Sequence, residues 1–425
     1  MDFLIFALPV LFLSLGFPIF MVLMVTAAVS IVVVMDMPGQ AIHQAIFGSL
    51  GAYSLLSVPF FLFAGEVMAK GSMSKRIIDW VMSLLGKTKG GLGFVTLGSS
   101  TFFGAISGSS VGTVAGIGRL VYPPMQREGY GPHFGTGLLS SSAAIAQLIP
   151  PSIVLILYGI SSQQSITKLF VAGILPGLVL ALVLAAYIYY YSRKNAAQSQ
   201  GESFSLIKFW RESRRVILAI FMPIFVLGGI YAGIFSPTEA AGIACVYAII
   251  VSCVIYRDVS MRELWDIAVS SMYTTAQILI IVAAAGLFSW VLTVNGVPAQ
   301  LSGWVSGMDI EKWQILLMIN LMLLLVGCFM DTMSATLLFS PLLLPIATSF
   351  GVDPIHLGII ITMNLSIGLF TPPFGINIFM VNAITGVGMK SIFQGVLPFV
   401  LVSLVALLLV TFIPSLSLAL IPFLS

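Results

Sequence analysis

The chain has 425 residues, of which 59% are hydrophobic and 8% charged, with a mean hydropathy of +1.10. A soluble domain carries roughly 25% charged residues, so 18 Lys+Arg and 15 Asp+Glu are too few to cover a soluble protein of this size. This excludes a soluble enzyme, a nucleic-acid-binding protein and a disordered chain. The long apolar runs predict an all-α polytopic membrane protein.

Twelve apolar segments follow one another along the chain, and we predict about ten to twelve membrane-embedded elements. The first segment is too long for one perpendicular span, so it either breaks at Gly16 and Pro18 or forms a long tilted helix. The segments are 3–35, 45–69, 76–86, 92–122, 133–160, 168–191, 216–235, 238–256, 264–294, 313–345, 355–386 and 391–424.

A basic stretch at 193–215 divides the chain into halves of similar length. It contains a third of the basic residues and is opposed by Glu202 and Glu212. The positive-inside rule places it in the cytoplasm. We therefore predict a first repeat over 1–192, a cytoplasmic basic linker over 193–215 and a second repeat over 216–425.

The prolines of the two halves share one register. At a shift of 222 residues, Pro123, Pro132, Pro150 and Pro151 match Pro345, Pro354, Pro372 and Pro373. A matched pattern on either side of a cytoplasmic loop is typical of a transporter built from repeats, and we expect the repeats to be inverted.

Each half contains a polar stretch inside an apolar run. In the first half, 104–113 is dense in Gly, Ser and Thr, and at the same shift 327–336 contains Asp331. Each stretch is either a close-packed small-residue helix or the tip of a re-entrant hairpin. We predict hairpins at about 92–122 and 313–345, the first with its tip at Ser107–Ser110.

Each half also contains a double proline in its next apolar run. Prolines remove backbone donors and leave carbonyls of the preceding turn free, so we predict broken helices at about 133–160 and 355–386. The free carbonyls suit a desolvated cation, and the N-termini of half-helices suit an anion. Hairpin tips beside broken helices are the arrangement expected around a midplane site.

Four charged residues within the apolar runs have alternative interpretations. Asp331 either takes part in sodium coordination, substrate binding or proton transfer, or caps a helix. Glu239 follows Ser236-Pro-Thr and is expected to cap a helix, whereas Glu66 is expected to pair with Lys70 one turn later. Arg119 either meets an anionic substrate or extends to the membrane interface.

The chain shows no GxSxG, HExxH or P-loop pattern, so we expect no enzyme and no ATP hydrolysis by a P-loop. Transport would then be coupled to an ion gradient or to another subunit. A membrane-embedded enzyme with Asp331 and Glu66 as an acid–base pair is an alternative of another class. The substrate-binding candidates from the polar tips and breaks are Ser107, Ser109, Ser110, Arg119, Ser152 and Asp331.

Several motifs, in this order, resemble the large membrane subunit of the tripartite ATP-independent periplasmic (TRAP) transporters. They span about residue 90 to residue 390, most of the chain. They are Gly90-Gly-Leu-Gly, Ala105-Ile-Ser-Gly-Ser-Ser, Ile149-Pro-Pro-Ser, Ser236-Pro-Thr-Glu-Ala-Ala, Asp331 before Pro341-Leu-Leu-Leu-Pro, Gly351-Val-Asp-Pro-Ile-His-Leu-Gly, and Asn364 through Thr371-Pro-Pro-Phe-Gly.

The resemblance implies an elevator-type symporter in the bacterial inner membrane, with a scaffold and a mobile transport domain made of the hairpins and broken helices. Two or more sodium ions would drive uptake of an organic acid, with sialic acid favoured over a C4-dicarboxylate. A periplasmic binding protein would deliver the substrate, and a small four-helix membrane subunit, expected as a separate polypeptide, would pair with this chain. An ion-coupled carboxylate transporter without a binding protein is the alternative of the same class.

The sodium sites of the family, carried over to this chain, fall on the tips and breaks of both halves. The tip Ser-Gly-Ser-Ser-Val-Gly-Thr departs from the pattern of many relatives, so the finer detail of the first site is not carried over. The implied sodium residues are Ser107, Gly108, Ser142, Pro150, Asp331, Thr332, Ser334, Asn364, Gly368, Thr371 and Pro372.

Overall fold

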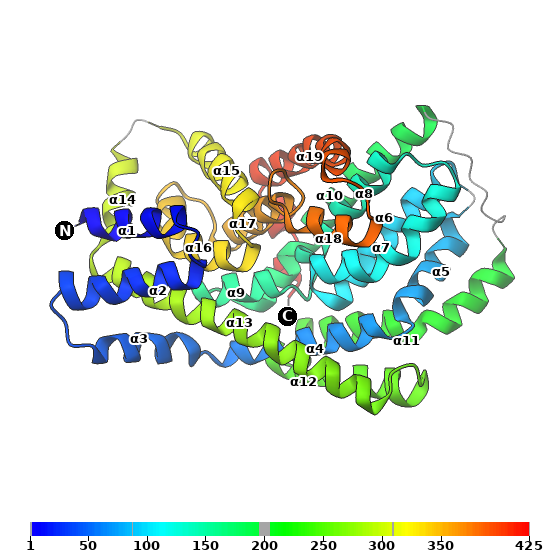
Figure 1. The fold of residues 1–425 in the computed structure, drawn as a ribbon, viewed down its shortest axis with the longest axis horizontal. Helices are drawn as coiled ribbons and strands as arrows, with labels where there is room; N and C mark the ends of the chain where they lie inside the picture. The colour runs from blue at the N-terminus through cyan, green and yellow to red at the C-terminus, as the bar shows by residue number, and fades with distance from the viewer. Residues whose placement is uncertain (1, 87, 195–204, 308–309, 425) are drawn as a thin grey trace.

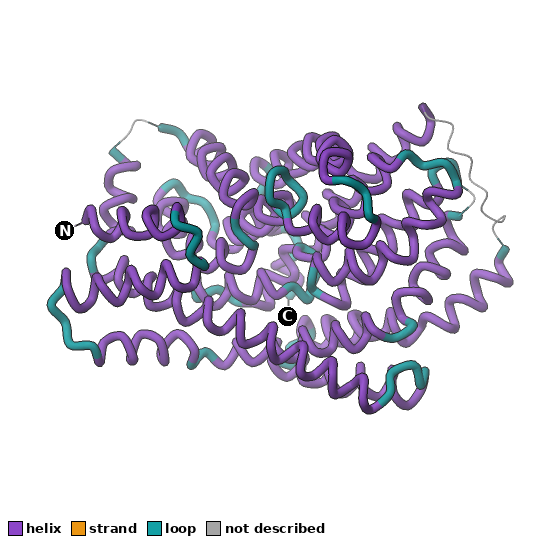
Figure 2. Tube along the Cα trace, viewed as in Figure 1, coloured by secondary structure: helices purple, strands orange, loops and turns teal. Residues whose placement is uncertain are grey.

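The computed structural model describes residues 2–86, 88–194, 205–307 and 310–424. Every regular element in these ranges is a helix (Figure 2). Within them, seven helices are long and apolar enough to cross a membrane, and the bent pair Gln40–Leu50 and Tyr53–Lys70 raises the number to eight if it is one span. The described structure is that of a multi-pass membrane protein.

Ten α-helices make up the described part of the first half. A π-helical turn extends the second to Val34, and a 3₁₀ turn at Ile145–Gln147 follows the eighth. The helices are α1 Asp2–Ser14, α2 Ile19–Val29, α3 Gln40–Leu50, α4 Ser57–Lys70, α5 Met73–Leu85, α6 Gly91–Ser107, α7 Ser110–Arg127, α8 Pro132–Ala144, α9 Ile153–Ser161 and α10 Ile166–Lys194.

The described part of the second half repeats this order from α11 onward. A π-helical turn again extends its second helix, here to Ile255. The helices are α11 Leu206–Tyr231, α12 Pro237–Ile249, α13 Met261–Val294, α14 Val297–Ser306, α15 Lys312–Phe329, α16 Thr332–Ser349, α17 Pro354–Gly368, α18 Ile376–Thr385, α19 Met389–Phe412 and α20 Ser415–Leu418.

The helix boundaries follow the proline register. Both ends of α7 match those of α16 at a shift of 222 residues, and the starts of α8 and α17 match in the same way. Long α13 takes the place of α3 and α4. The two halves therefore share one order of elements as well as one pattern of prolines.

The first apolar segment is broken, as one of the two alternatives predicted. Helix α1 ends at Ser14, Gly16 has a left-handed φ of +80°, and α2 begins at Ile19 after Pro18. Glycine adopts this φ without the steric cost that a Cβ would add. The long run is therefore two helices rather than one tilted span.

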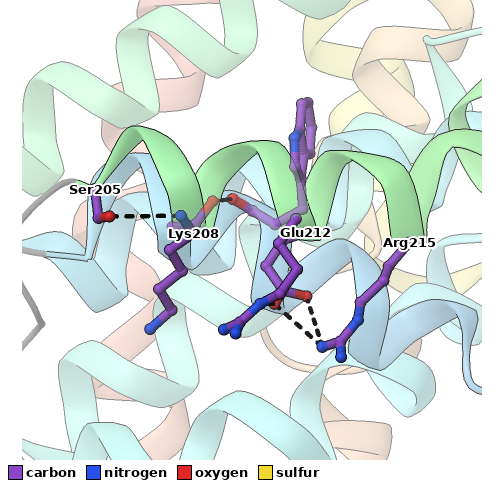
Figure 3. Close-up of polar contacts among 7 residues, drawn as sticks. Ser205, Lys208, Glu212 and Arg215 are labelled. Carbon is purple, nitrogen blue, oxygen red and sulfur yellow. Dashed lines mark hydrogen bonds and ion pairs between the residues drawn. The ribbon is translucent and has the colours of Figure 1, made fainter.

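The basic stretch at 193–215 lies partly on helices. Helix α10 extends to Lys194 and α11 begins at Leu206, so the first turns of α11 carry Lys208 to Arg215; residues 195–204, with Glu202, lie outside the described residues. The hydroxyl oxygen of Ser205 accepts the Lys208 N–H at 3.5 Å and caps α11 (Figure 3). Buried Glu212 accepts from Arg211 and Arg215, each at 3.2 Å.

The helices form two groups that each combine elements of both halves. In the first group α12 packs on α4, and α13 packs on α2, α3 and α4; α3, α4, α12 and α13 follow the lower edge of Figure 1. In the second group α8 packs on α19, α15 on α17 and α7 on α18. The hairpins α6–α7 and α15–α16 and both broken helices belong to the second group.

Close backbone contact holds the second group together. A Cβ added to Gly395 of α19 would clash with the carbonyl group of His133, and one added to Gly137 of α8 would clash with the carbonyl group of Gly395. Small residues that let backbones approach are the usual basis of helix association in membranes, where burial of apolar surface does not drive it.

We expect Gly395→Leu to destabilise the protein because the new side chain has no space between α19 and α8. Overpacking of this kind typically costs roughly 1–3 kcal/mol, and here backbone rather than a flexible side chain would have to move. The measurement is the midpoint of thermal unfolding of the detergent-purified chain. Gly242→Ala on α12, where an added Cβ meets nothing within 4 Å, is the control and should leave the midpoint unchanged or raised.

Candidate functional site

The predicted tip of the first hairpin is a break between two helices. Helix α6 ends at Ser107, Gly108 has φ +60°, and Ser109 caps α7 by accepting the Gly112 N–H at 3.2 Å. The Ser107 hydroxyl lies 3.2 Å from that of Thr113, which donates to the Ser109 carbonyl oxygen at 2.8 Å. The tip is thus a hairpin turn and not a continuous small-residue helix.

The first broken helix packs against this tip. Residues 148–152 separate the 3₁₀ turn from α9 and contain Pro150 and Pro151. A Cβ on Gly108 would lie 2.7 Å from the Pro151 carbonyl oxygen, so hairpin and break meet backbone to backbone. Ser152 caps α9 by accepting the Leu155 N–H, and its hydroxyl donates to the Gln147 carbonyl oxygen at 2.6 Å.

Asp331 caps a helix at the tip of the second hairpin. Its Oδ1 accepts the N–H groups of Met333 and Ser334, both at 3.0 Å. The capping alternative is therefore present in the structure. Among the described residues Asp331 Oδ2 accepts no hydrogen bond, and the half-buried side chain lines a cavity of about 600 Å³ with Phe20 and Gln277.

The second tip and the second break also meet backbone to backbone. A Cβ on Gly368 would lie 2.6 Å from backbone atoms of Gly327. Residues 369–375, which include Thr371, Pro372 and Pro373, separate α17 from α18. Buried Asn364 of α17 donates to Asn320 Oδ1 of α15 at 2.8 Å, which ties the break to the hairpin.

A buried glutamine joins the two half-sites. Gln147 Nε2, beside the first break, donates to the Thr332 hydroxyl oxygen of the second tip at 2.9 Å. The Ser366 hydroxyl of α17 donates to Gln147 Oε1 at 3.0 Å. One side chain of the first half therefore contacts both the hairpin and the broken helix of the second.

A buried asparagine makes the reciprocal connection. Asn377 Nδ2 of α18 donates to the Ser110 hydroxyl oxygen at 2.7 Å and to the Ser140 carbonyl oxygen at 2.9 Å. Sequence reasoning missed both amides as site residues. Their signal was available, because uncharged amides within apolar runs need partners that only other helices can supply at membrane depth.

Several buried oxygens around the tips and breaks accept no hydrogen bond in the described residues. Such atoms normally have a partner, and uncharged oxygens are suitable ligands for a hard cation such as sodium. Ser334 and Asn364 were predicted as sodium residues, whereas the others were not. The atoms are Ser140 Oγ, Asn377 Oδ1, Ser334 Oγ, Thr336 Oγ1, Thr362 Oγ1 and Asn364 Oδ1.

Other predicted oxygens have partners. The Ser142 hydroxyl donates to Ser100 Oγ at 3.2 Å, and the Thr371 hydroxyl donates to the Ile367 carbonyl oxygen at 2.7 Å. Thr332 is engaged by Gln147. A hairpin tip thus meets a helix break in each half, at Gly108 with Pro151 and at Gly327 with Gly368, and we call these the tip–break contacts. Ser142 bonds to the interior of α6, and Arg119 lines a separate cavity.

Arg119 lies on α7, beyond the tip, in a cavity of about 630 Å³. Helices α4, α5 and α13 form the other walls, and the lining includes Glu66, Lys70, Lys75 and Asp266. We call this cavity the charged pocket. In the described residues Arg119 is exposed and forms no ion pair.

The predicted pair of Glu66 with Lys70 is wrong for the described structure. Glu66 Oε2 instead accepts from the Ser271 hydroxyl of α13 at 2.8 Å. Glu66 is half-buried against α13 while Lys70 is exposed, so the tertiary contact outweighs the local i,i+4 pairing. The capping prediction for Glu239 is confirmed: Ser236 and Glu239 form a capping box at the start of α12, with Pro237 in its first turn.

The two carboxylates of the enzyme alternative line different cavities in the described part of the chain. Glu66 lines the charged pocket, whereas Asp331 lines the cavity beside Phe20. An acid–base pair must reach one substrate together, so this arrangement does not support the alternative.

Two matched hairpins and two broken helices, packed tip to break within a polytopic helical protein, are the architecture of a membrane transporter. A solved structure of similar fold is the Alcanivorax borkumensis YdaH transporter, at a TM-score of 0.62, with 13% identity and 88% of each chain covered. That identity is low, so the likeness concerns the fold.

Residues 6–416 match the family described as "Tripartite ATP-independent periplasmic transporter, DctM component". The chain belongs to this family of TRAP transporter large permeases.

Three curated relatives have different named substrates. The chain is 38% identical over 405 residues to the isethionate TRAP transporter permease DctMQ of Oleidesulfovibrio alaskensis, covering 95% of this chain but 64% of that protein. It is 39% identical to the C4-dicarboxylate permease DctM of Pseudomonas aeruginosa (87% and 86% covered). It is 32% identical to the sialic acid permease SiaM of Vibrio cholerae (89% and 88% covered).

We expect Gln147→Leu to weaken the folded state because it removes both hydrogen bonds between the half-sites. Loss of buried hydrogen bonds that leaves partners unpaired costs roughly 1–3 kcal/mol each. Combined with Ser366→Ala in a double-mutant cycle, it should show a non-additive coupling of roughly 0.5 kcal/mol or more. The free energy of unfolding in mixed detergent micelles measures both.

The control pairs Gln147→Leu with Ser30→Ala in the π-helical turn that extends α2, where the Ser30 hydroxyl bonds to the Thr26 carbonyl oxygen one turn earlier. That pair should be additive. Additive effects for Gln147 and Ser366 would contradict the bridge.

Proposed function

We propose that this chain is the transport subunit of a sodium-driven importer of an organic acid. The observation that carries the proposal is the pair of tip–break contacts, joined by Gln147 and surrounded by buried oxygens without partners. Sodium would bind at each contact, held by hydroxyl, amide and backbone oxygens. The predicted tip residues Ser107, Gly108 and Asp331 through Ser334 would contribute to the two sites.

The first proposed site lies between the α6–α7 tip and the first break. Its ligand candidates are the carbonyl groups around Pro150 and the hydroxyls of the tip. The second lies between the α15–α16 tip and the second break, where Ser334 Oγ and Asn364 Oδ1 are without partners. Asp331 Oδ2 would supply the one negative charge, while Oδ1 remains on the helix cap.

An inverted arrangement of the two halves is part of the proposal. The Tyr158 hydroxyl, near the end of α9, donates to the carbonyl oxygen of Pro354 at the start of α17 at 2.6 Å. His133, at the start of α8, contacts Ser391 at the start of α19. The end of α9 therefore lies beside the start of α17. If α8 and α9 together cross the membrane, α8 begins on one side and its equivalent α17 begins on the other, as inverted repeats require.

The elevator movement is supported by the grouping of the helices. The group of α1 to α5 with α11 to α14 would be the scaffold. The group of hairpins, broken helices, α10 and α19 would move across it with substrate and sodium. Each group contains the equivalent helices of both halves, as a repeat-built transporter requires.

The substrate and partners follow from the family and remain proposals. Relatives are named for isethionate, C4-dicarboxylates and sialic acid, so the shared chemistry is a small organic anion, and sialic acid and C4-dicarboxylates are the first to test. The family is described as tripartite and periplasmic. We therefore propose a small membrane subunit and a periplasmic substrate-binding protein as the other two components, in the inner membrane.

The decisive experiment is uptake by proteoliposomes that contain this chain, the small subunit and the binding protein. Radiolabelled N-acetylneuraminate, succinate and isethionate serve as substrates. We expect accumulation of at least one of them when an inward sodium gradient is imposed. Accumulation that persists after the gradient is collapsed would contradict sodium coupling, and full activity without the binding protein would favour the self-sufficient carboxylate transporter.

We expect Asp331→Asn to raise the sodium concentration for half-maximal uptake by about tenfold or more, because it removes the charge from Oδ2. The amide oxygen can still accept the two N–H groups, so the cap and the fold should survive. Initial uptake rates against sodium concentration provide the readout, with thermal unfolding as the check on folding. Glu239→Gln, which alters a cap away from both tips, is the control, and an unchanged sodium dependence in Asp331→Asn would remove this carboxylate from the site.

A further inference from the structure

The charged pocket has a counterpart in the second half. A second cavity, of about 620 Å³, lies between α3, α13 and α16 and includes Gln44, Gly48 and Pro341 in its lining. At the shift of 222 residues these three positions match Asp266, Ser270 and Arg119 of the charged pocket. The two cavities are thus equivalent places in the two halves, each between the second helix of a hairpin and the long helices of the first group.

The two cavities differ in charge. None of the residues that line the second cavity carries a charge, so we call it the neutral pocket. The charged pocket contains three basic residues and two acidic ones. Proline stands at the position equivalent to Arg119 and glutamine at that of Asp266.

The pockets lie at opposite ends of α13. The charged pocket uses Asp266 to Ser270 near its start, and the neutral pocket uses Val282 to Thr293 near its end. Their centres are separated by about 20 residues, or ~30 Å along a helix, which is the thickness of the hydrocarbon core. Figure 1 shows α13 crossing the lower half of the molecule, with α3 below it in this view.

A chain of contacts places the charged pocket on the side of the basic linker. Ser72, in the turn between α4 and α5, donates its N–H to Asp258 Oδ2 at 2.7 Å. Arg76 lies over the ring of Tyr256 at 3.9 Å, and the Tyr256 hydroxyl donates to the Arg215 carbonyl oxygen at 2.9 Å. This end of α4 and α13 is therefore tied to the basic first turns of α11.

Arg119 is the cation best placed to bind an anion. Lys70 lies near Glu263 and Lys75 lies near Asp79, so a neighbouring carboxylate partly offsets the positive charge of each lysine. Arg119 forms no ion pair in the described residues and stands on α7 beyond Gly112, Ala115 and Gly116, which line the same pocket. These small residues continue the lining of the pocket from Arg119 along α7 toward the hairpin tip. A guanidinium group can hold a carboxylate with two parallel hydrogen bonds.

We propose that the charged pocket is a carboxylate-binding station on the linker side of the membrane, and that the neutral pocket is the entrance on the opposite side. The inference rests on the proposed function, and it adds where the anion binds after leaving the midplane. Arg119 binds the carboxylate, and Lys70 and Lys75 attract it toward the linker side. The neutral pocket offers amide and hydroxyl groups and no charge that would retain the anion at the entrance.

Matched cysteine variants test the location of the two pockets. Ser270→Cys places a thiol in the charged pocket and Gly48→Cys places one at the equivalent position of the neutral pocket, where a Cβ has nothing within 4 Å. The parent chain, whose cysteines 245, 253 and 328 are buried or half-buried, gives the background. Exposed Arg214→Cys marks the linker side in proteoliposomes of the complete transporter.

With membrane-impermeant methanethiosulfonates, Ser270→Cys should react from the same side as Arg214→Cys, and Gly48→Cys from the other. For each thiol we compare the modification rate of the anionic sulfonatoethyl reagent with that of the cationic trimethylammonioethyl reagent. This rate ratio should be roughly three- to tenfold higher at Ser270→Cys than at Gly48→Cys. Adding Arg119→Gln should reduce this preference, whereas Lys168→Gln, on α10 outside both pockets, should not. Reaction of both thiols from one side, or an equal reagent preference, would overturn the proposal.

Protection by substrate tests the carboxylate station itself. N-acetylneuraminate or succinate should slow modification of Ser270→Cys by the cationic reagent at least threefold, and Arg119→Gln should abolish the effect. If neither compound protects although sodium drives uptake of at least one of the two, the station is refuted and the proposed function stands. Sodium-driven uptake of isethionate alone would likewise overturn a station for carboxylates. If protection occurs without sodium-driven uptake, the anion site stands and sodium coupling fails.

Discussion

The structure depends on one constraint, which is that backbone polar groups inside a membrane must find partners within the protein. Helices meet this demand by themselves, but the hairpin tips at Gly108 and Asp331 and the double-proline breaks do not. Here each tip lies against the break of its own half, and Ser109 and Asp331 accept backbone N–H groups of the tips. Amides from the other half donate to hydroxyl oxygens of the tips. Gln147 and Asn377 perform this role in opposite directions, so neither half-site is complete alone.

The same constraint explains why oxygens without partners gather at these contacts. Leaving a buried hydroxyl or amide oxygen unpaired costs free energy, and six such atoms lie on the helices that form the two contacts. A bound cation would satisfy them and would be released from them when it leaves.

Local chemistry made part of this fold predictable. Gly16 with Pro18, the two double prolines and Ser236-Pro-Thr-Glu each act through neighbouring residues, and the breaks and the cap lie where the sequence indicated. The predicted pairing of Glu66 with Lys70 is wrong because the partner of Glu66 is Ser271, 205 positions away in the sequence. The rotation of α4 against α13 determines this contact, and local spacing cannot predict that rotation. Gln147 was visible as an amide in an apolar run, but its contact with Thr332 depends on how two halves dock.

The two halves share an order of helices, but their equivalent cavities differ in the charge of the side chains that line them. Matching elements create matching cavities at the two ends of α13, yet Arg119 has Pro341 as its equivalent and Asp266 has Gln44. Charged groups near apolar surroundings are costly unless they are hydrated or paired. Charges in the described lining of one cavity and not of the other are therefore a chemical difference between two equivalent places. If Arg119 binds the substrate carboxylate as proposed, two cavities built by equivalent helices differ in their affinity for an anion.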